Sequence, residues 1–464
     1  MVSNARKKKT DMENRRKFNK HLKDRVLFFR IAFIGIFLLA VILRFYHLDM
    51  RVFHHDESAI GFNTYQLFKG GIYSYDPVFH GPFLNYVTAD MFRLFGDSDY
   101  SSRLLPAFLG AFMLFLLIPL NRYIGNAGIL ITALFLALSP SFLYYSRFFR
   151  EDIFIAFFSL LILVCAVKYA GKRAEKKYSY MRLFYLFLGG AALASIEALK
   201  ENAYIMMFLI VLFLILLFIR EKQYKIWAEK MVIMEALFFI LVLLIVSSYL
   251  YTGKVFDFHG MKEVFEKAVS YWYAKHQTAQ LGGSPFYYLN ILVRYELPVL
   301  VFGVIGIIHY FKKNNLFMSF LGYWAISNFI IYSYLQEKVP WLLLNPLLPL
   351  TLIAGAYIGE FLTRLKLNTK GGMTAAIFLT AASVFFIYSS IFLNFFDYTN
   401  TKEPLIQGNQ VPQEFKEINL SKLYVWASEL NGKPAKITLP ERQPVTTFLW
   451  YFRHYDNIEI YYLE

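Results

Sequence analysis

The sequence has little charge and almost no cysteine. Charged residues make up 17% of the 464 positions, against 57% hydrophobic and 19% aromatic residues, whereas soluble domains are about one quarter charged. The one cysteine, Cys165, lies inside an apolar run, which excludes an intrachain disulfide. No Walker loop, dinucleotide-binding glycine motif, HExxH sequence or paired-cysteine metal site is present, so transport driven by an ATPase of this chain is excluded. The composition indicates a polytopic membrane protein.

The net charge of +15 is gathered into clusters, and their positions argue against a nucleic-acid partner. Residues 1–30 contain eleven Lys or Arg against three acids, and further basic clusters lie at 172–182, 220–230, 312–313 and 364–370. With a cytoplasmic N-terminus and eleven spans, every one of these clusters lies on the inside, as the positive-inside rule requires. We therefore predict a multi-pass protein of the cytoplasmic (plasma) membrane whose first loop is outside.

The transmembrane helices are predicted from apolar runs of roughly 20 residues. The first run is too long for a signal-peptide core and lacks a small-residue cleavage site, so we expect it to stay as a helix. The fold class is thus an all-α membrane protein of about eleven transmembrane helices. The expected spans are 26–46, 101–120, 127–144, 152–170, 183–198, 202–219, 231–251, 291–310, 316–335, 341–362 and 373–396.

Three regions follow from this pattern: a basic cytoplasmic N-terminus (1–25), a transmembrane domain (26–396) and an extracytoplasmic tail (397–464). The first outer loop, 47–100, should contain two amphipathic surface helices at about 57–69 and 82–95. The second large outer loop, 253–290, is rich in Tyr and Trp. In the tail, 435–439 and 457–462 alternate like strands, which predicts a small α/β unit.

Asp56 and Glu57 follow closely on the first span, beside His54 and His55. Carboxylates at a bilayer surface are partly desolvated, so they either pair with a cation or take part in chemistry. In the functional interpretation Asp56 is a general base, and Glu57 orients it, caps a helix or binds a metal. In the structural interpretation, an acid that precedes a helix accepts hydrogen bonds from the free N–H groups of its first turn. The local sequence leaves both open.

Further ionisable groups stand at the same predicted boundary. His80, in a His-Gly-Pro turn, is either an interfacial residue or a ligand of substrate or metal. Arg147 and Arg150 are three residues apart, which predicts a shared helix face suited to phosphate, or arginines that snorkel to the interface. Such groups usually face a cavity or pair within the protein interior. The other candidates are Asp152, Lys200, Glu201, Glu337, Lys338 and Trp341.

In their order along the chain, these features resemble the dolichyl-phosphate-mannose–protein mannosyltransferases of glycosyltransferase family 39. That superfamily, with the related aminoarabinose transferases, has an outer Asp-Glu followed by His-Pro-Pro or Lys-Pro-Pro, and Gly81 departs from this motif. Residues 147–152 resemble its second motif, an Arg-rich turn that ends in Asp. Residues 337–341 and 450–453 look like those of a prokaryotic, flippase-associated branch.

The resemblance covers roughly residues 27–400 and is most specific at 54–84. It implies an inverting glycosyltransferase of the GT-C type, which moves a sugar from a polyprenyl-phosphate carrier to a hydroxyl of an acceptor protein, lipid or glycan on the outer face. Asp56 and Glu57 are then the expected catalytic residues, with a divalent metal at Glu57 and His80 left open. The expected substrate-binding residues are His55, His80, Arg147, Arg150, Asp152, Lys200, Glu201, Glu337, Lys338 and Trp341.

The alternative belongs to another class: a transporter of lipid-linked sugars or a flippase accessory that binds the same ligand without reacting it. Such a protein would keep the cationic residues and the apolar grooves but would have no need of Asp56.

Overall fold

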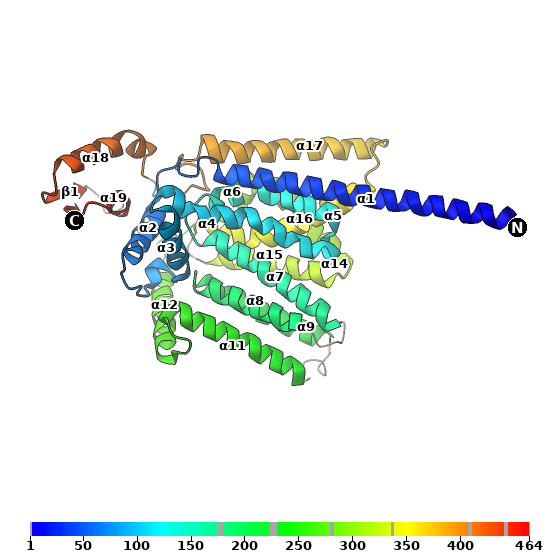
Figure 1. Ribbon diagram of the computed structural model, residues 1–464, viewed down its shortest axis with the longest axis horizontal. Coiled ribbons are helices and arrows are strands. Elements are labelled where there is room, and N and C mark those ends of the chain that lie inside the picture. The colour runs from blue at the N-terminus through cyan, green and yellow to red at the C-terminus, as the bar shows by residue number, and fades with distance from the viewer. Residues whose placement is uncertain are drawn as a thin grey trace.

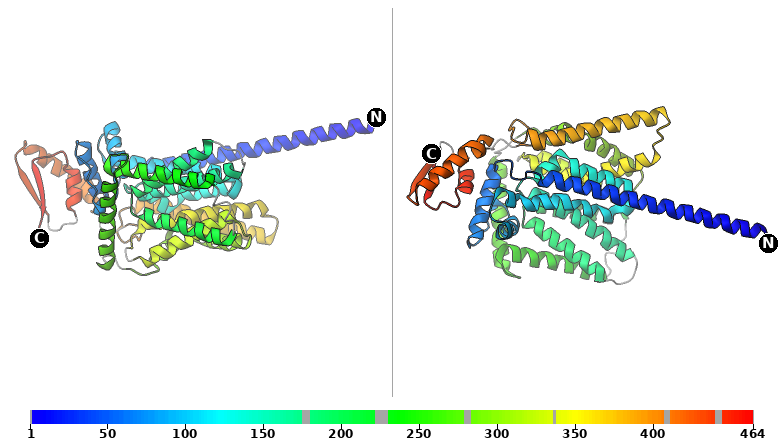
Figure 2. Two further views of the ribbon diagram at one scale, coloured as in Figure 1. Left: turned by 90° about the horizontal axis from the view of Figure 1, so that it is seen from below. Right: turned by 45° about the horizontal axis from the view of Figure 1, so that its top comes forward.

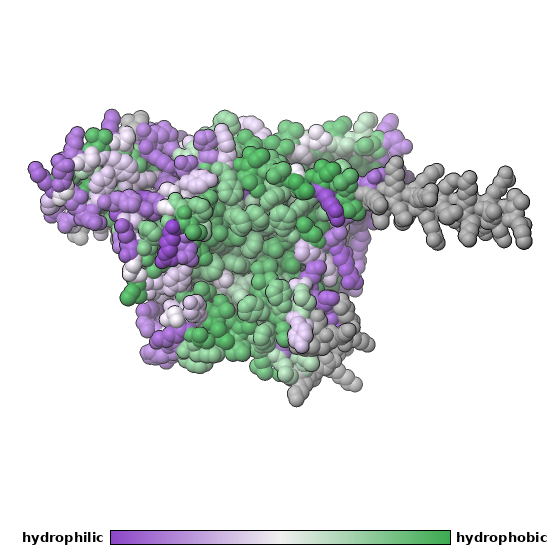
Figure 3. Space-filling model, in the orientation of Figure 1, coloured by the Kyte–Doolittle hydropathy of each residue, from purple (hydrophilic) through white to green (hydrophobic). Residues whose placement is uncertain are grey.

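The computed structural model describes residues 2–174, 180–221, 230–278, 283–335, 338–406, 411–439 and 444–463. Long helices run side by side in a bundle, and a smaller layer covers one end of it (Figure 1). On the face seen in Figure 3, a band of apolar side chains covers the bundle between two more polar ends, as expected for a protein in a bilayer. The fold is the all-α membrane fold with a small α/β tail that the sequence predicts.

The bundle is built around α16, whose residues are almost all apolar and largely buried. Small residues let the neighbouring helices approach it closely. A Cβ at Gly355 would lie 2.1 Å from Thr132 Oγ1, and one at Gly303 would lie 2.4 Å from Leu350 Cδ1. The long helices of the bundle are α1 (Val2–Phe45), α4 (Asp99–Phe112), α5 (Asn121–Leu138), α7 (Asp152–Ala174), α8 (Tyr180–Glu197), α9 (Asn202–Glu221), α11 (Lys230–Thr252), α14 (Leu297–Lys312), α15 (Leu316–Tyr334), α16 (Leu344–Arg364) and α17 (Lys370–Ile391).

Within the described residues, eight helices are long and apolar enough to cross a membrane, or up to nine if the bent pair α13 (Tyr287–Tyr295) and α14 is one span. The sequence-based count of eleven is larger for two reasons. The expected spans 101–120 and 127–144 fall largely in one 40-residue stretch, Asp99–Leu138. The expected span 183–198 falls on α8, which is not among the eight.

The stretch Asp99–Leu138 begins and ends at the same end of the bundle. It also contains the 3₁₀ helix η2 (Met113–Leu120). Near its start, Arg103 donates to Leu48 O at 3.2 Å. Near its end, Leu136 O accepts from Arg44 at 2.7 Å. Gly125, with φ of 71°, interrupts the helical geometry between them. The stretch therefore folds back on itself, which is the arrangement that two separate spans would have.

The end of the bundle at which α1 ends and α2 begins, the loop end, carries the short helices. Among them, α2 (His55–Phe68) and α3 (Phe83–Phe95) confirm the two helices predicted for the first loop. The helix α12 (Phe258–Thr278) lies across the direction of the long helices (Figures 1 and 2). The others at or near this end are η1 (Pro77–Phe79), α6 (Pro140–Ser146), α13, η3 (Pro340–Leu343) and η4 (Phe392–Phe396).

The tail contains η5 (Phe415–Asn419), α18 (Leu420–Glu429), β1 (Ala435–Leu439), α19 (Val445–Tyr451) and β2 (Ile458–Tyr462). The strands β1 and β2 pair in parallel, with Ala435 opposite Ile458, and they confirm the two strands predicted from alternation.

The tail is docked on the first loop through α19. Trp450 is fully buried, stacks on Phe53 at 5.0 Å between ring centres, and donates from Nε1 to Asp99 Oδ1 at 2.8 Å. The Tyr451 hydroxyl donates to the other oxygen of Asp99, also at 2.8 Å. Gly61 on α2 makes room for the indole, because a Cβ there would lie 3.0 Å from a Trp450 ring carbon. The tail thus completes the core of the loop-end layer.

Candidate functional site

The first turn of α2 separates the two neighbouring acids. His54 is the N-cap residue, and its ring accepts from the Asp56 backbone N–H at 3.1 Å. Glu57 closes a capping box, because its side chain accepts from the His54 backbone N–H at 3.0 Å. The capping role that the sequence allowed for either acid therefore belongs to Glu57. The Asp56 carboxylate is left to face the loop end, with 29% of its side chain exposed.

Glu57 is fully buried, and both of its carboxylate oxygens are occupied. Arg103 donates to them from Nε at 2.8 Å and from Nη2 at 2.7 Å, and Arg51 Nη2 lies 3.3 Å away. The Phe149 backbone N–H donates at 2.8 Å. Burial favours the neutral acid, but the two arginines and these hydrogen bonds outweigh it and lower the pKa of Glu57 to about 2. Glu57 thereby ties α2 to α4 and to the turn after α6.

Asp56 forms an ion pair with Arg150, which comes from the turn between α6 and α7. Burial alone would raise the pKa of Asp56, but Arg150 opposes it most strongly, followed by His54, His55 and Lys200. The pKa of Asp56 is therefore held below its ordinary value, and the carboxylate is ionised throughout the neutral range.

Arg150 is the centre of a charged cluster. Its Nε lies 3.6 Å from Glu151 Oε2 and 3.6 Å from Asp152 Oδ2, and its guanidinium lies over the Trp341 ring, 3.9 Å from the ring centre. Lys200, from the turn between α8 and α9, contacts Asp152 Oδ1 at 3.4 Å. Three carboxylates and two cations from three different parts of the chain thus meet at the loop end.

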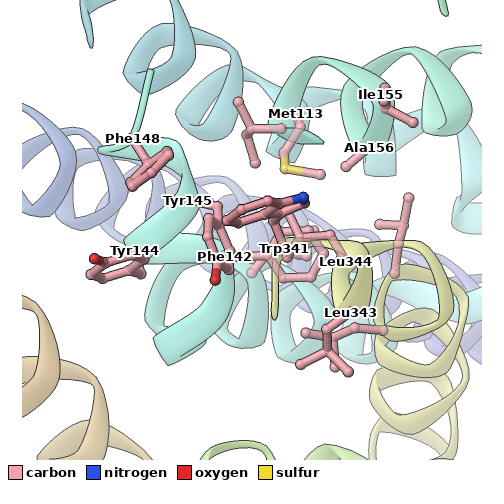
Figure 4. Packing of buried hydrophobic residues seen from close by; sticks show 14 of the residues in the cluster. Met113, Phe142, Tyr144, Tyr145, Phe148, Ile155, Ala156, Trp341, Leu343 and Leu344 are labelled. Carbon is pink, nitrogen blue, oxygen red and sulfur yellow. The ribbon is translucent and has the colours of Figure 1, made fainter. Parts of the chain in front are cut away.

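Trp341 packs against the Arg150 guanidinium in this cluster. It lies on η3 beside Phe142 and Tyr145, with Met113 and Ala156 close by (Figure 4). Its indole Nε1 is buried and has no hydrogen-bond partner among the described residues, and the same holds for Asp152 Oδ2. Buried polar atoms without partners are costly. An indole N–H without an acceptor, near a carboxylate oxygen that has an ion-pair partner but no hydrogen bond, indicates a site that a polar ligand would complete.

His80 lies beside the same turn as Lys200. Its Nδ1 is 2.8 Å from Glu201 Oε2, and its ring is parallel to Trp272 of α12 at 5.9 Å. Gly81 replaces the first proline of the resembled motif for a steric reason: a Cβ there would lie 2.2 Å from the Ala198 carbonyl oxygen. The backbone of this turn therefore packs directly on the turn between α8 and α9, and it positions both His80 and Lys200.

Arg147 and Lys338 occupy other positions than the sequence suggested. Arg147 and Arg150 share no helix face, because α6 ends at Ser146 and α7 begins at Asp152. The Arg147 guanidinium donates to four carbonyls where α1 ends, at 2.8–3.1 Å. Lys338 Nζ donates in the same way to the carbonyls of Tyr332, Ser333 and Leu335 at the C-terminal end of α15. Both cations cap helix C-termini, where positive charge is favoured.

His55 and Glu337 are the remaining candidates from the sequence. His55 Nδ1 lies 2.8 Å from the Thr446 hydroxyl of the tail, so it links α2 to α19. Glu337 lies outside the described residues. Glu57 and His80, the residues considered for a metal, are committed to Arg103 and Glu201. In the described part of the chain no group of three or more His, Cys, Asp or Glu is arranged to hold a metal ion, and we derive no step through one.

The sequence did not single out Arg103, although this residue binds Glu57. Arg103 carried a signal, because it stands at the start of an apolar run, where an arginine needs a buried partner. Glu151 was expected from the sequence only as a partner of Arg150, which it is in the structure.

An apolar groove approaches this cluster along the bundle. It has a volume of about 420 Å³ and is lined by α7, α9 and α15, including Leu163, Met206 and Trp324. The same three helices reach the charged cluster: α7 begins with Asp152, α9 begins just after Lys200, and α15 ends just before Lys338. The groove therefore lies along the same three helices whose loop-end termini reach the charged cluster.

Comparison with known proteins finds a family model that matches part of the chain. Residues 63–260 match the family model described as dolichyl-phosphate-mannose-protein mannosyltransferase. No match was found among curated proteins.

Solved structures match over nearly the whole chain. ArnT from Cupriavidus metallidurans in the apo state matches at 15% identity and a TM-score of 0.61, covering 94% of this chain and 86% of that one. ArnT bound to undecaprenyl phosphate matches at 16% identity and 0.60, covering 92% and 85%. The apo oligosaccharyltransferase of Archaeoglobus fulgidus matches at 13% identity and 0.60, covering 93% and 64%. The chain therefore shares the fold of these two proteins.

Proposed function

We propose that the protein is an inverting glycosyltransferase that moves a sugar from a polyprenyl-phosphate carrier to an acceptor hydroxyl, with Asp56 as the general base. The observation that carries the proposal is a partly open, ionised carboxylate held by Arg150, beside a buried site whose indole N–H has no acceptor among the described residues. Helices that reach this site also line an apolar groove. The match to the mannosyltransferase family and the likeness to ArnT support a lipid-linked donor.

Asp56 would take the proton of the acceptor hydroxyl while the hydroxyl oxygen attacks the anomeric carbon of the sugar. The bond between that carbon and the phosphate oxygen breaks, and the polyprenyl phosphate leaves as a stable anion. The low pKa of Asp56 keeps the carboxylate ionised before the reaction. A weak base is sufficient, because the hydroxyl becomes strongly acidic only when its oxygen has begun to bond to carbon.

The donor phosphate needs positive charge and hydrogen-bond donors. Arg147 and Lys338 are held by backbone carbonyls, so we assign this role to Lys200, Arg150 and the indole N–H of Trp341. Lys200 lies 5.8 Å from the Trp341 ring centre, so the two side chains flank one space. Arg150 already faces three carboxylates, and a phosphate would compete with them for it.

The apolar groove would hold the prenyl chain nearest the phosphate. Its lining is almost entirely hydrocarbon, and its helices lead to the cluster that would bind the phosphate. This arrangement requires the loop end to face the outside of the plasma membrane and the N-terminus to face the cytoplasm, as the basic clusters predict.

The test uses the purified full-length protein, a panel of undecaprenyl-phosphate-linked sugars and candidate acceptors. Asp56→Asn keeps the shape of the side chain and removes its basicity, so we expect transfer to fall by about 10²–10⁴-fold with undecaprenyl phosphate binding retained. Asp90→Asn, which alters an exposed acid of α3, is the matched control.

Transfer by Asp56→Asn at the rate of the parent would refute the base assignment. Carrier binding by the parent with no transfer to any acceptor would favour the transporter or flippase-accessory class instead.

A further inference from the structure

Four buried arginines gather at the loop end, apart from the Arg150 cluster. Arg44, Arg51, Arg103 and Arg147 are each at most 7% exposed. Among the described residues, the ion pairs of these four arginines involve a single carboxylate, that of Glu57. Buried charges of one sign are costly unless they are compensated.

Helix termini compensate part of this charge. Arg147 donates to carbonyls where α1 ends, and Arg44 donates to Leu136 and Ala137 where α5 ends. Each terminus carries roughly half a negative charge. Asp99 lies close to Arg103, but Lys416 already pairs with it at 2.7 Å. Glu57 and the two termini together therefore offset only about half of the positive charge.

A small polar cavity lies within this cluster. Its volume is about 10 Å³, and it is lined by Arg51, Arg103 and Arg147 together with Tyr144, Asn394 and Tyr398. That volume holds one water-sized particle. Arg51 is 6% exposed, and its Nε is buried with no hydrogen-bond partner among the described residues. Burial, followed by the charges of Arg51 and Arg103, lowers the pKa of Arg147 to about 9, although the charge of Asp49 acts in the opposite direction.

We propose that this cavity binds one small monovalent anion of the size of chloride. An anion there would supply the missing negative charge and an acceptor for Arg51 Nε. A water molecule fits the same space but leaves the charge uncompensated. The small volume favours such an ion over a phosphate or a lipid headgroup, which has four oxygen atoms to place.

The anion would act on structure. Arg51 and Arg103 both bind Glu57, and Glu57 caps α2, so the anion stabilises the helix start that carries Asp56. The proposal does not depend on the catalytic assignment, because it rests on the charge balance and the cavity alone.

Bromide replaces chloride and scatters X-rays anomalously, so crystals of the full chain grown in sodium bromide test the site directly. We expect an anomalous peak between Arg51, Arg103 and Arg147. Peaks confined to the protein surface, or an empty cavity, would refute the proposal.

Thermal unfolding gives the second measurement. At constant ionic strength, replacing gluconate with chloride should raise the Tm by a few degrees and then saturate, because a ligand of the folded state stabilises it by mass action. Arg51→Met should abolish this rise, while Arg93→Met, at an exposed arginine paired with Asp90, should keep it. An equal Tm in both salts, or a rise with phosphate only, would exclude chloride. If Arg51→Met does not fold, the bromide measurement on the parent decides alone.

Discussion

Glu57→Gln tests whether the two neighbouring acids have the separate roles that their contacts indicate. The substitution preserves the shape of the side chain, but it removes the negative charge that faces Arg103 and Arg51, and it places an NH₂ group against one of their donors. The two arginines would then be buried without their carboxylate. We therefore expect Glu57→Gln to lose stability, and Asp56→Asn to lose activity with little change in stability.

Two estimates of the magnitude agree. Removing one partner of a buried ion pair costs about 3–5 kcal/mol. The pKa of Glu57 falls from 4.5 to about 2 in the folded protein, and at 1.36 kcal/mol per unit this corresponds to about 3 kcal/mol. Because the folded-state pKa is the lower one, this stability is fully present above pH ~4.5 and is lost as the pH falls toward ~2.

The assay is thermal unfolding of the purified parent, Glu57→Gln and Asp56→Asn in the same detergent, between pH 7 and pH 3. Glu57→Gln should unfold at a clearly lower temperature at pH 7, and its difference from the parent should shrink below pH ~4.5. The reasoning is refuted if Glu57→Gln unfolds at the parental temperature but loses transfer, because Glu57 would then act on the substrate.

Three further predictions follow from single contacts. Gly81→Ala should destabilise the protein, since its Cβ would meet the Ala198 carbonyl oxygen at 2.2 Å; thermal unfolding measures this, and an unchanged Tm contradicts the steric argument. Lys200→Met should weaken undecaprenyl phosphate binding by about 10- to 100-fold, the loss of one charged hydrogen bond, whereas an exposed lysine changed in the same way should not; equal affinities would place the phosphate elsewhere. In a variant without the native cysteine, an impermeant thiol reagent should label a cysteine at Ser74 but not one at Asn314 from outside intact cells, and the reverse would overturn the orientation.

Much of the fold follows from local sequence patterns. The loop helices α2 and α3 and the tail strands lie within two residues of their predicted positions, because amphipathic and alternating patterns are local signals. The division of 99–138 into spans depends on where the chain turns, and that turn rests on Gly125 and on contacts of Arg103 and Leu136 with distant residues.

The candidate site was only partly predictable. Asp56, Arg150, Asp152, Lys200 and Trp341 do come together, and their residue types at a membrane boundary indicated this. The charge of a side chain does not, however, identify the group with which it pairs. The prediction that Arg147 and Arg150 share a helix face was wrong. The partners of Arg147 and Lys338 are backbone carbonyls, and because every residue has one, the residue types do not reveal such partners.

The burial of Trp450 has a consequence for biogenesis. Its partner Asp99 precedes it by 351 residues, and Phe53 precedes it by still more. At ~5–20 residues per second a ribosome needs roughly 20–70 s to cover that distance. In the proposed orientation, the first loop would cross the membrane before its core is filled, and it would stay exposed until α19 has been synthesised and translocated.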